Sequence, residues 1–241
     1  MGISRWIVKG RCALMPPMHR NGLTRLIGGL ALAAGCAGEW AELPAGGVEL
    51  ARRETTVAAF VEFLNGAARS DYPETAQIAR RPGGGYAVRA GAARQAVAEV
   101  TAAEAEAYCA WRSRREGRTV RLPTAAEWER AARGGVEGAP YPWGWGGDPA
   151  ARARFDAAGP APRAGAYPAN GFGLRDVAGN LYEWCAAAPA DPAGRRLACG
   201  GSWAERDPRR LEVGHRQDFP EDYRGRDVGF RALREREEAR K

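Results

Sequence analysis

From Gly135 to the C-terminus the pattern of residues leaves no room for a long helix, and this feature restricts the fold more than any other. Gly, Pro, Asn and Asp interrupt this half of the chain repeatedly, and these residues favour turns and end helices. The large residues Trp143, Trp145, Trp184 and Trp203 are scattered through it. We therefore expect short strands and loops in this half, and an α+β fold overall.

The first half contains three helix signals. Residues 54–66, ETTVAAFVEFLNG, place apolar residues at helical spacing and end in Asn65-Gly66, so we expect a helix ended by a left-handed residue. The sequence TAAE occurs at 101–104 and again at 124–127. Each is a capping box, in which Thr and Glu satisfy the first backbone amides of a helix. We expect these two helices to run to about Gly117 and to Gly134-Gly135.

Composition and charge indicate a globular domain without a nucleic-acid partner. The 241 residues are 45% hydrophobic and 27% charged, enough apolar material for a buried core. The formal charge is +7, but residues 1–35 contain five basic and no acidic residues, which leaves the rest of the chain close to neutral. A general phosphate binder needs a basic surface, so we expect no nucleic-acid binding.

The N-terminal segment is typical of an export signal. From Met18, Arg20 and Arg25 accompany a short apolar run, 26–34, which is followed by small residues. This run is too short for a transmembrane helix, which needs about 20 apolar residues. The segment 32–36, LAAGC, resembles a bacterial lipoprotein cleavage box, although Leu32 lies one position early; Cys36 would become the acylated first residue.

These signals define the expected organisation. Residues 1–36 form a leader and residues 37–241 form one domain, exported to the periplasm or the outer membrane of a bacterium. Contact with the membrane is expected only through a lipid at Cys36. A buried N-terminal helix is the alternative interpretation of the apolar run.

The five cysteines do not form a disulfide-rich scaffold. Cys12 and Cys36 fall in the leader. Cys109 lies in a helical pattern, where we expect a buried and inert thiol. Cys185 and Cys199 could pair in an oxidising compartment, and their separation in sequence does not decide between a disulfide and two free thiols.

Several segments follow the order and spacing of the sulfatase-modifying-factor family. They are RLPTAAEWERAARGG (121–135), YPWGW (141–145), NGFGLRDVAGNLYEW (170–184), GGSW (200–203) and VGFRAL (228–233). The chain resembles a domain of the formylglycine-generating-enzyme type over about residues 54–234. The resemblance implies a compact fold of low regularity, related to C-type lectins.

Most of the residues in these segments have a structural interpretation. We expect Trp128, Trp143, Phe172 and Trp184 to belong to the core, because aromatic side chains supply large buried areas. The pairs Asn170-Gly171 and Gly179-Asn180 can enter turns with positive φ at low cost.

The metal ligands of the oxidising members of the family are missing. In formylglycine-generating enzymes two thiolates hold Cu(I), and the resemblance places their counterparts at Glu205 and Arg210. An arginine has no lone pair to offer a metal. A related branch, the sulfoxide synthases, holds iron with three histidines, whereas this chain has two in all, one of them in the leader. We therefore expect neither copper nor iron, and we assign no catalytic residue.

Calcium is the cofactor that the resemblance still allows. Family members hold it with oxygen donors, and Asn180 and Glu183 in GNLYEW are the candidate ligands here. The alternative for Asn180 is a turn residue that satisfies its own backbone. A second family site begins with Asn at a position that is Arg154 here, so we expect that site to be lost or altered.

The surface that corresponds to the family's active groove offers a mixture of charges beside an aromatic ring. Its residues are Trp203, Glu205, Arg210, His215 and Arg216. Such a surface suits a polar ligand or an extended peptide, with arginine binding a carboxylate. A solvated surface without a ligand is the alternative.

The expected function is that of a non-catalytic or divergent binding module for a peptide, a protein or a glycan. The alternative is an oxygen-dependent redox enzyme of the same family, acting in formylglycine generation or in the maturation of a periplasmic peptide or siderophore. A third hypothesis is an accessory domain of an envelope complex.

Overall fold

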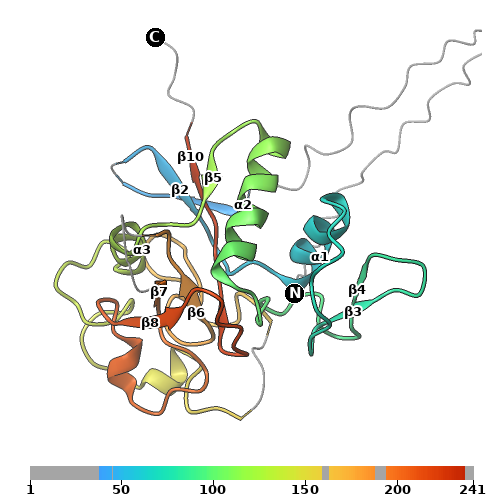
Figure 1. Ribbon diagram of the computed structural model, residues 1–241. Helices are drawn as coiled ribbons and strands as arrows, with labels where there is room; N and C mark the ends of the chain where they lie inside the picture. The colour runs from blue at the N-terminus through green and yellow to red at the C-terminus, as the bar shows by residue number, and fades with distance from the viewer. Residues whose placement is uncertain (1–37, 45, 159–162, 188–193, 237–241) are drawn as a thin grey trace, which may run out of the picture. The chain divides into compact units, whose positions relative to one another are not determined.

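Residues 38–44, 46–158, 163–187 and 194–236 are described by a computed structural model (Figure 1). Contacts along the chain group Gly35–Lys241 into one unit, and all of the described residues belong to it. The predicted leader, including Cys36, lies outside the described residues. None of the described helices has the length and apolar character needed to cross a membrane.

Three α-helices occur where the sequence predicts them: α1 (Val57–Gly66), α2 (Ala102–Glu116) and α3 (Ala125–Ala132). Both capping boxes are formed, with Thr101 and Thr124 accepting from the amides of Glu104 and Glu127. Gly117 ends α2 in the left-handed conformation, with φ of 66°.

The prediction for α1 was right about the end of the helix at Gly66, but wrong about where the helix begins and about which residue is left-handed. The helix begins after Thr56, whose hydroxyl accepts from the amide of Ala59, so residues 54 and 55 remain extended. The left-handed residue is Ala68, with φ of 50°, and not Gly66. Its amide donates to the carbonyl of Asn65, so the turn closes two residues later than glycine preference alone indicates.

The first sheet joins the two ends of the described chain. Its strands are β1 (Trp40–Glu42), β2 (Val48–Ala51), β10 (Leu233–Glu235) and β5 (Val120–Arg121), in that spatial order and antiparallel throughout. Leu233 pairs with Leu50 on one side and with Arg121 on the other. The C-terminal strand is therefore held at the middle of the sheet. A separate hairpin, β3 (Ile78–Arg80) with β4 (Tyr86–Val88), lies beside α1 (Figure 1).

A second four-stranded sheet positions the candidate site. Its order is β8 (Arg216–Pro220), β7 (Arg195–Cys199), β6 (Tyr182–Trp184) and β9 (Val228–Gly229), with β6 and β9 parallel. Side chains alternate between the faces of a strand. The register therefore places Tyr182, Ala198 and Gln217 on one face, and Glu183, Cys199 and Arg216 on the other.

Only short helical turns occur after Gly135 in the described residues, namely η1 (Pro149–Ala151) and η2 (Pro208–Leu211). The prediction of strands and loops for this half is confirmed, and so is the α+β class. Gly179 and Asn180 have the predicted positive φ, at 71° and 63°. Asn170-Gly171 does not, because the Asn170 side chain forms the turn by accepting from the amides of Phe172 and Leu174.

Aromatic side chains fill the core. Around α1 and α2 the rings of Phe60, Phe63, Tyr72, Tyr108 and Phe230 pack together. Most of these pairs are edge to face or tilted, which suits the negative faces and positive edges of aromatic rings, and Phe60 and Tyr108 are stacked.

The aromatic residues predicted for the core fall into two groups. Trp128 and Trp184 have no exposed surface, as predicted, and Cys109 is also buried. Trp143 and Phe172 are only half-buried. Phe172 packs against the core cluster that contains Trp128, and Trp143 packs against a small cluster around Leu211.

Candidate functional site

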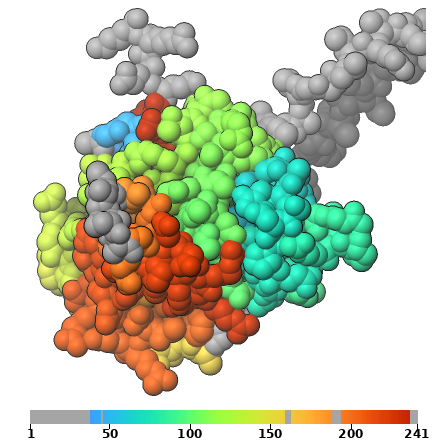
Figure 2. Space-filling view, viewed as in Figure 1, coloured from blue at the N-terminus to red at the C-terminus, as the bar shows by residue number. Residues whose placement is uncertain are grey.

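Five polar side chains meet at the Tyr182 face of the second sheet. We call them the Tyr182 cluster: Tyr182, Glu205, Arg210, His215 and Gln217. The Tyr182 hydroxyl donates to Glu205 Oε1 over 2.7 Å. Arg210 Nη1 lies 3.3 Å from His215 Nε2 and donates to Gln217 Oε1 over 3.4 Å. The rings of Tyr182 and His215 are 6.4 Å apart between centroids. Figure 2 shows the late residues, coloured orange to red, gathered over much of one face.

Two strands, one short helical turn and the turn after it bring four of these residues together. β6 and β8 present Tyr182 and Gln217 from the same side, because each pairs with β7 in register. Arg210 comes from η2, which Asp207 caps by accepting from the amide of Arg209 and which starts with proline. His215 follows in a turn in which its amide donates to the carbonyl of Glu212.

The surroundings fix the protonation of two of these groups. Burial, and then the positive charge of Arg210, lower the pKa of His215, so its imidazole is neutral at pH 7. Burial, together with the hydrogen bond to Glu205, raises the pKa of Tyr182. Tyr182 therefore keeps its proton and donates a hydrogen bond to the Glu205 carboxylate.

The structure brings three of the five predicted surface residues together, namely Glu205, Arg210 and His215. Trp203 lies near them in sequence, but its indole donates to the carbonyl of Arg226 over 3.1 Å and its ring packs against Leu181 and neighbouring alanines.

Arg216 lies apart from the Tyr182 cluster, contrary to expectation. It pairs with Cys199, on the opposite face of the sheet, and its guanidinium binds Glu129 of α3 over 2.5 Å. The pleat of β8 causes this separation, since neighbouring residues of a strand point to opposite faces.

The two positions that correspond to the copper ligands do not fit a cuprous ion. They hold a carboxylate that is hydrogen-bonded to a phenol and a guanidinium, and Cu(I) prefers soft thiolates. Cys185 and Cys199 do face each other, with their sulfur atoms 3.5 Å apart, but both are fully buried and lie on the Glu183 face of the sheet. Hydrogen bonding and burial raise the pKa of Cys185, which keeps it as a thiol.

Glu183, as arranged here, does not fit a calcium ion. Oε2 accepts from Trp128 Nε1 and Arg231 Nε, both over 2.6 Å, and Oε1 accepts from Arg231 Nη2. The carboxylate, the guanidinium and the indole are all buried. Among the described residues no three His, Cys, Asp or Glu side chains form a group that could hold a metal.

Asn180 has a different partner, Glu54, which the sequence did not single out as a site residue. Asn180 Nδ2 donates to Glu54 Oε2 over 2.6 Å, while Asn180 Oδ1 and Glu54 Oε1 are buried without a hydrogen bond. Burial, and then the charges of Asp176 and Glu183, raise the pKa of Glu54 well above its usual value. Asp176 itself is held by the amides of residues 165–167.

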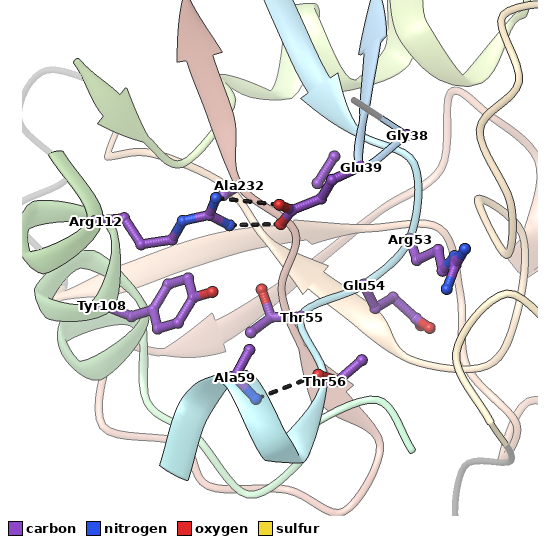
Figure 3. Close-up of a pocket in the computed structure, with 11 residues that line it drawn as sticks. Gly38, Glu39, Arg53, Glu54, Thr55, Thr56, Ala59, Tyr108, Arg112 and Ala232 are labelled. Carbon is purple, nitrogen blue, oxygen red and sulfur yellow. Dashed lines mark hydrogen bonds and ion pairs between the residues drawn. The ribbon is translucent and has the colours of Figure 1, made fainter. Parts of the chain in front are cut away.

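A cavity of about 400 Å³ opens beside the first sheet, among the residues just before β1, the segment from the end of β2 to the start of α1, and α2 (Figure 3). Arg112 binds Glu39 at one side, with 2.6 Å between Nη1 and Oε1, and Tyr108 points from α2 toward Thr55. None of the residues predicted from the sequence as binding or metal ligands lines this cavity. Its ion pair is satisfied within the protein, because Arg112 also donates to Glu116 over 2.6 Å.

Sequence reasoning missed Tyr182 and Gln217 as members of the cluster. Alternation along YEW could have indicated that Tyr182 and Glu183 face opposite sides. No local signal identifies Gln217, because its position depends on the pairing of Ala198 with β8.

Comparison with known proteins identifies the family. The sequence model of the sulfatase-modifying factor enzyme 1-like domain matches residues 42–236. The chain is 40% identical over 123 residues to the mouse protein "Inactive C-alpha-formylglycine-generating enzyme 2", covering 45% of this chain and 38% of that protein. It is 33% identical over 183 residues to the formylglycine-generating enzyme of Streptomyces coelicolor, covering 63% of this chain and 56% of that enzyme. These matches span well under two thirds of each relative's length.

Solved structures share the fold. PvdO from Pseudomonas aeruginosa superposes with a TM-score of 0.63 at 26% identity, over 78% of this chain and 80% of that chain. CarF also gives a TM-score of 0.63, at 21% identity, over 78% and 86%. With the family match over most of the described residues, these similarities establish that the chain belongs to the sulfatase-modifying factor family and has its formylglycine-generating-enzyme-like fold.

Proposed function

We propose that this chain is a non-catalytic binding module of its family, and that it binds a peptide, a protein or a glycan at the Tyr182 cluster. The observation that carries the proposal is the chemistry at Glu205 and Arg210. Glu205 accepts from Tyr182, and Arg210 contacts His215 and Gln217. Neither side chain provides the sulfur donor that oxygen chemistry on copper requires.

Two further observations support the proposal. The mouse and cattle relatives that match at 40% and 38% identity carry the word "inactive" in their names. In addition, the cluster offers hydrogen-bond donors and acceptors of both charges around a phenol and an imidazole. Such groups bind and orient a polar chain without any metal.

The experiment is a turnover assay. The purified chain is incubated with a cysteine-containing sulfatase peptide, oxygen, a reductant and supplied Cu(I), and the peptide is analysed by mass spectrometry. We expect the cysteine to remain unchanged, while an active formylglycine-generating enzyme converts the peptide in parallel. Conversion by this chain would overturn the proposal.

The alternative function is an oxygen-dependent redox enzyme, and the neighbouring thiols of Cys185 and Cys199 are the observation in its favour. Their burial and the raised pKa of Cys185 weigh against it, since a substrate has no route to a fully buried thiol pair in a packed core. The same turnover assay with Cys185→Ser separates the two functions, because only the redox enzyme would lose an activity.

We also propose that the chain is exported to the periplasm or the outer membrane, with Cys36 acylated. The leader pattern of residues 18–36 supports this proposal. The intact mass of protein recovered from a membrane fraction tests it: a lipid-modified chain that begins at Cys36 is expected, and an unprocessed chain in the soluble fraction would contradict it.

A further inference from the structure

We propose that Arg210 binds a carboxylate group of the ligand through the two guanidinium nitrogens that point away from His215. This inference rests on the proposed function and names the chemical class that the Tyr182 cluster recognises. The class is a peptide-borne carboxylate, either a chain terminus or an acidic side chain.

The hydrogen bonds of Arg210 leave one side of its guanidinium open. Nη1 lies 3.3 Å from His215 Nε2 and 3.4 Å from Gln217 Oε1, and these two contacts orient the planar group. For Nε and Nη2, the described part of the chain provides no hydrogen bond or ion pair. Nε–H and Nη2–H are parallel donors, the arrangement that binds both oxygens of one carboxylate.

In Arg209, the preceding residue, a carboxylate already binds the same pair of donors, Nε–H and Nη2–H. Its Nε lies 3.0 Å from both carboxylate oxygens of Asp207, and its Nη2 lies 2.7 Å from Oδ2. Both arginines belong to η2 and both are exposed. The pair therefore differs mainly in whether a carboxylate of the chain already occupies the fork.

The carboxylates nearest to the cluster are otherwise engaged or lie beyond ion-pair distance of Arg210. Glu205 accepts from Tyr182, and Asp207 binds Arg209. Glu212, the remaining acid whose charge reaches His215, forms no ion pair with Arg210. Within the described ranges, the charge of Arg210 is therefore not neutralised by an acid of the chain.

The surroundings favour a carboxylate over a phosphate or a sulfate. The imidazole of His215 is neutral near pH 7 because its pKa is lowered, and Arg209 is already paired. A single unpaired guanidinium provides one positive charge and a planar fork, which matches a monoanionic planar group. A phosphate dianion is better served by several cations.

The experiment uses His215 as a reporter in the full chain. The chain contains two histidines, so NMR spectra of the chain and of His215→Gln assign the His215 ring resonances directly. The probes are N-acetylglycine, which presents a terminal carboxylate, and N-acetylaspartic acid amide, which presents a side-chain carboxylate. N-acetylglycinamide is the neutral control.

We expect at least one of the two carboxylates to shift the His215 resonances in a saturable manner and to raise the pKa of His215. The physical reason is that a bound anion cancels the positive charge that lowers this pKa. The stronger probe identifies the source of the carboxylate. Arg210→Gln should weaken binding about tenfold, the loss expected for a charge-assisted hydrogen-bonded pair, and should raise the pKa of His215 in the absence of any probe.

The matched control is Arg209→Gln combined with Asp207→Asn, because it removes the neighbouring arginine without leaving the Asp207 carboxylate free beside Arg210. It should bind the carboxylate as the unaltered chain does. The proposal is overturned if neither carboxylate shifts His215, if the neutral amide produces the same shift, or if this control and Arg210→Gln weaken binding equally. A failure here leaves the result of the turnover assay unchanged, so the two proposals are tested separately.

Discussion

Replacement of Arg231 by methionine tests how much one buried arginine stabilises the contact between the N-terminal strand β2 and the second sheet. Arg231 is fully buried, next to the C-terminal strand β10. It donates to both oxygens of Glu183, to the carbonyl of Ala51 over 3.2 Å and to the carbonyl of Arg175 over 2.9 Å. One side chain therefore connects β6, the end of β2 and the loop before Asp176.

The expected loss in the free energy of unfolding is about 3–5 kcal/mol, the range found when one partner of a buried ion pair is removed. Arg231→Met leaves the Glu183 carboxylate in the core with, among the described residues, only the Trp128 indole as a side-chain donor. It also removes the side-chain donor to the carbonyls of Ala51 and Arg175. Burial of the methionine side chain recovers little of this, because the charge of Glu183 remains.

Arg195→Met is the matched control. Arg195 binds Asp218 over 2.5 Å, much as Arg231 binds Glu183, but these side chains are 40% and 47% exposed. Solvent screens such a pair, so its loss should change stability by less than about 1 kcal/mol.

The assay is equilibrium unfolding in urea, followed by tryptophan fluorescence and extrapolated linearly to water. A second variant, Arg231→Met with Glu183→Gln, should be more stable than Arg231→Met because the carboxylate that loses its partner is removed together with that partner. It also keeps the test informative if the single variant does not fold. Equal losses for Arg231→Met and Arg195→Met would refute the argument from burial.

Three other substitutions have defined outcomes. Glu54→Gln should remove a pH dependence of stability. Because the pKa of Glu54 is raised, the folded state keeps a proton that the unfolded chain loses above about pH 4.5, so the stability of the unaltered chain falls as pH rises through this region. The stability of the variant should fall less, as urea titrations at several pH values would show. Gly179→Ala should lower the midpoint of thermal unfolding far more than Gly144→Ala. Both glycines have positive φ, but only at Gly179 would an added Cβ collide with a backbone oxygen, that of Arg154. Thr124→Ala should cost about 1 kcal/mol through loss of the α3 cap, and an unchanged urea midpoint would contradict this.

The helices could be predicted from the sequence because their signals are local. A capping box needs only the residues from Thr101 to Glu104, and the structure forms it as expected. The helix α1 ends at Gly66 as predicted, but the turn that follows it shows the limit of such reasoning. Glycine preference pointed to Gly66, whereas backbone hydrogen bonds from Ala68 and Arg69 to Asn65 and Leu64 decide where the chain turns.

The site was only partly predictable, because it depends on strand register. Motif spacing led to Glu205, Arg210 and His215, which do lie close together. It also led to Arg216, which the pleat of β8 directs to Glu129. Which residues share a face follows from the pairing of distant strands, and no short segment of the sequence contains that information.

An interior ion pair and an interior hydrogen bond were equally hidden from sequence reasoning. Glu183 was considered as a calcium ligand on account of its motif, but its partner, Arg231, lies 48 positions away. The partner of Asn180, Glu54, lies 126 positions away. Contacts at such separations are products of the fold, and only the structure shows which oxygen atoms are already occupied.

Copper binding under reducing conditions tests the central claim most directly. The chain carrying Cys12→Ser and Cys36→Ser is reconstituted with Cu(I), passed through a desalting column and analysed for metal per chain. The account predicts no stoichiometric copper, because Glu205 and Arg210 provide no sulfur and the remaining thiols are buried. One firmly held copper ion per chain, lost again on Cys185→Ser, would contradict it.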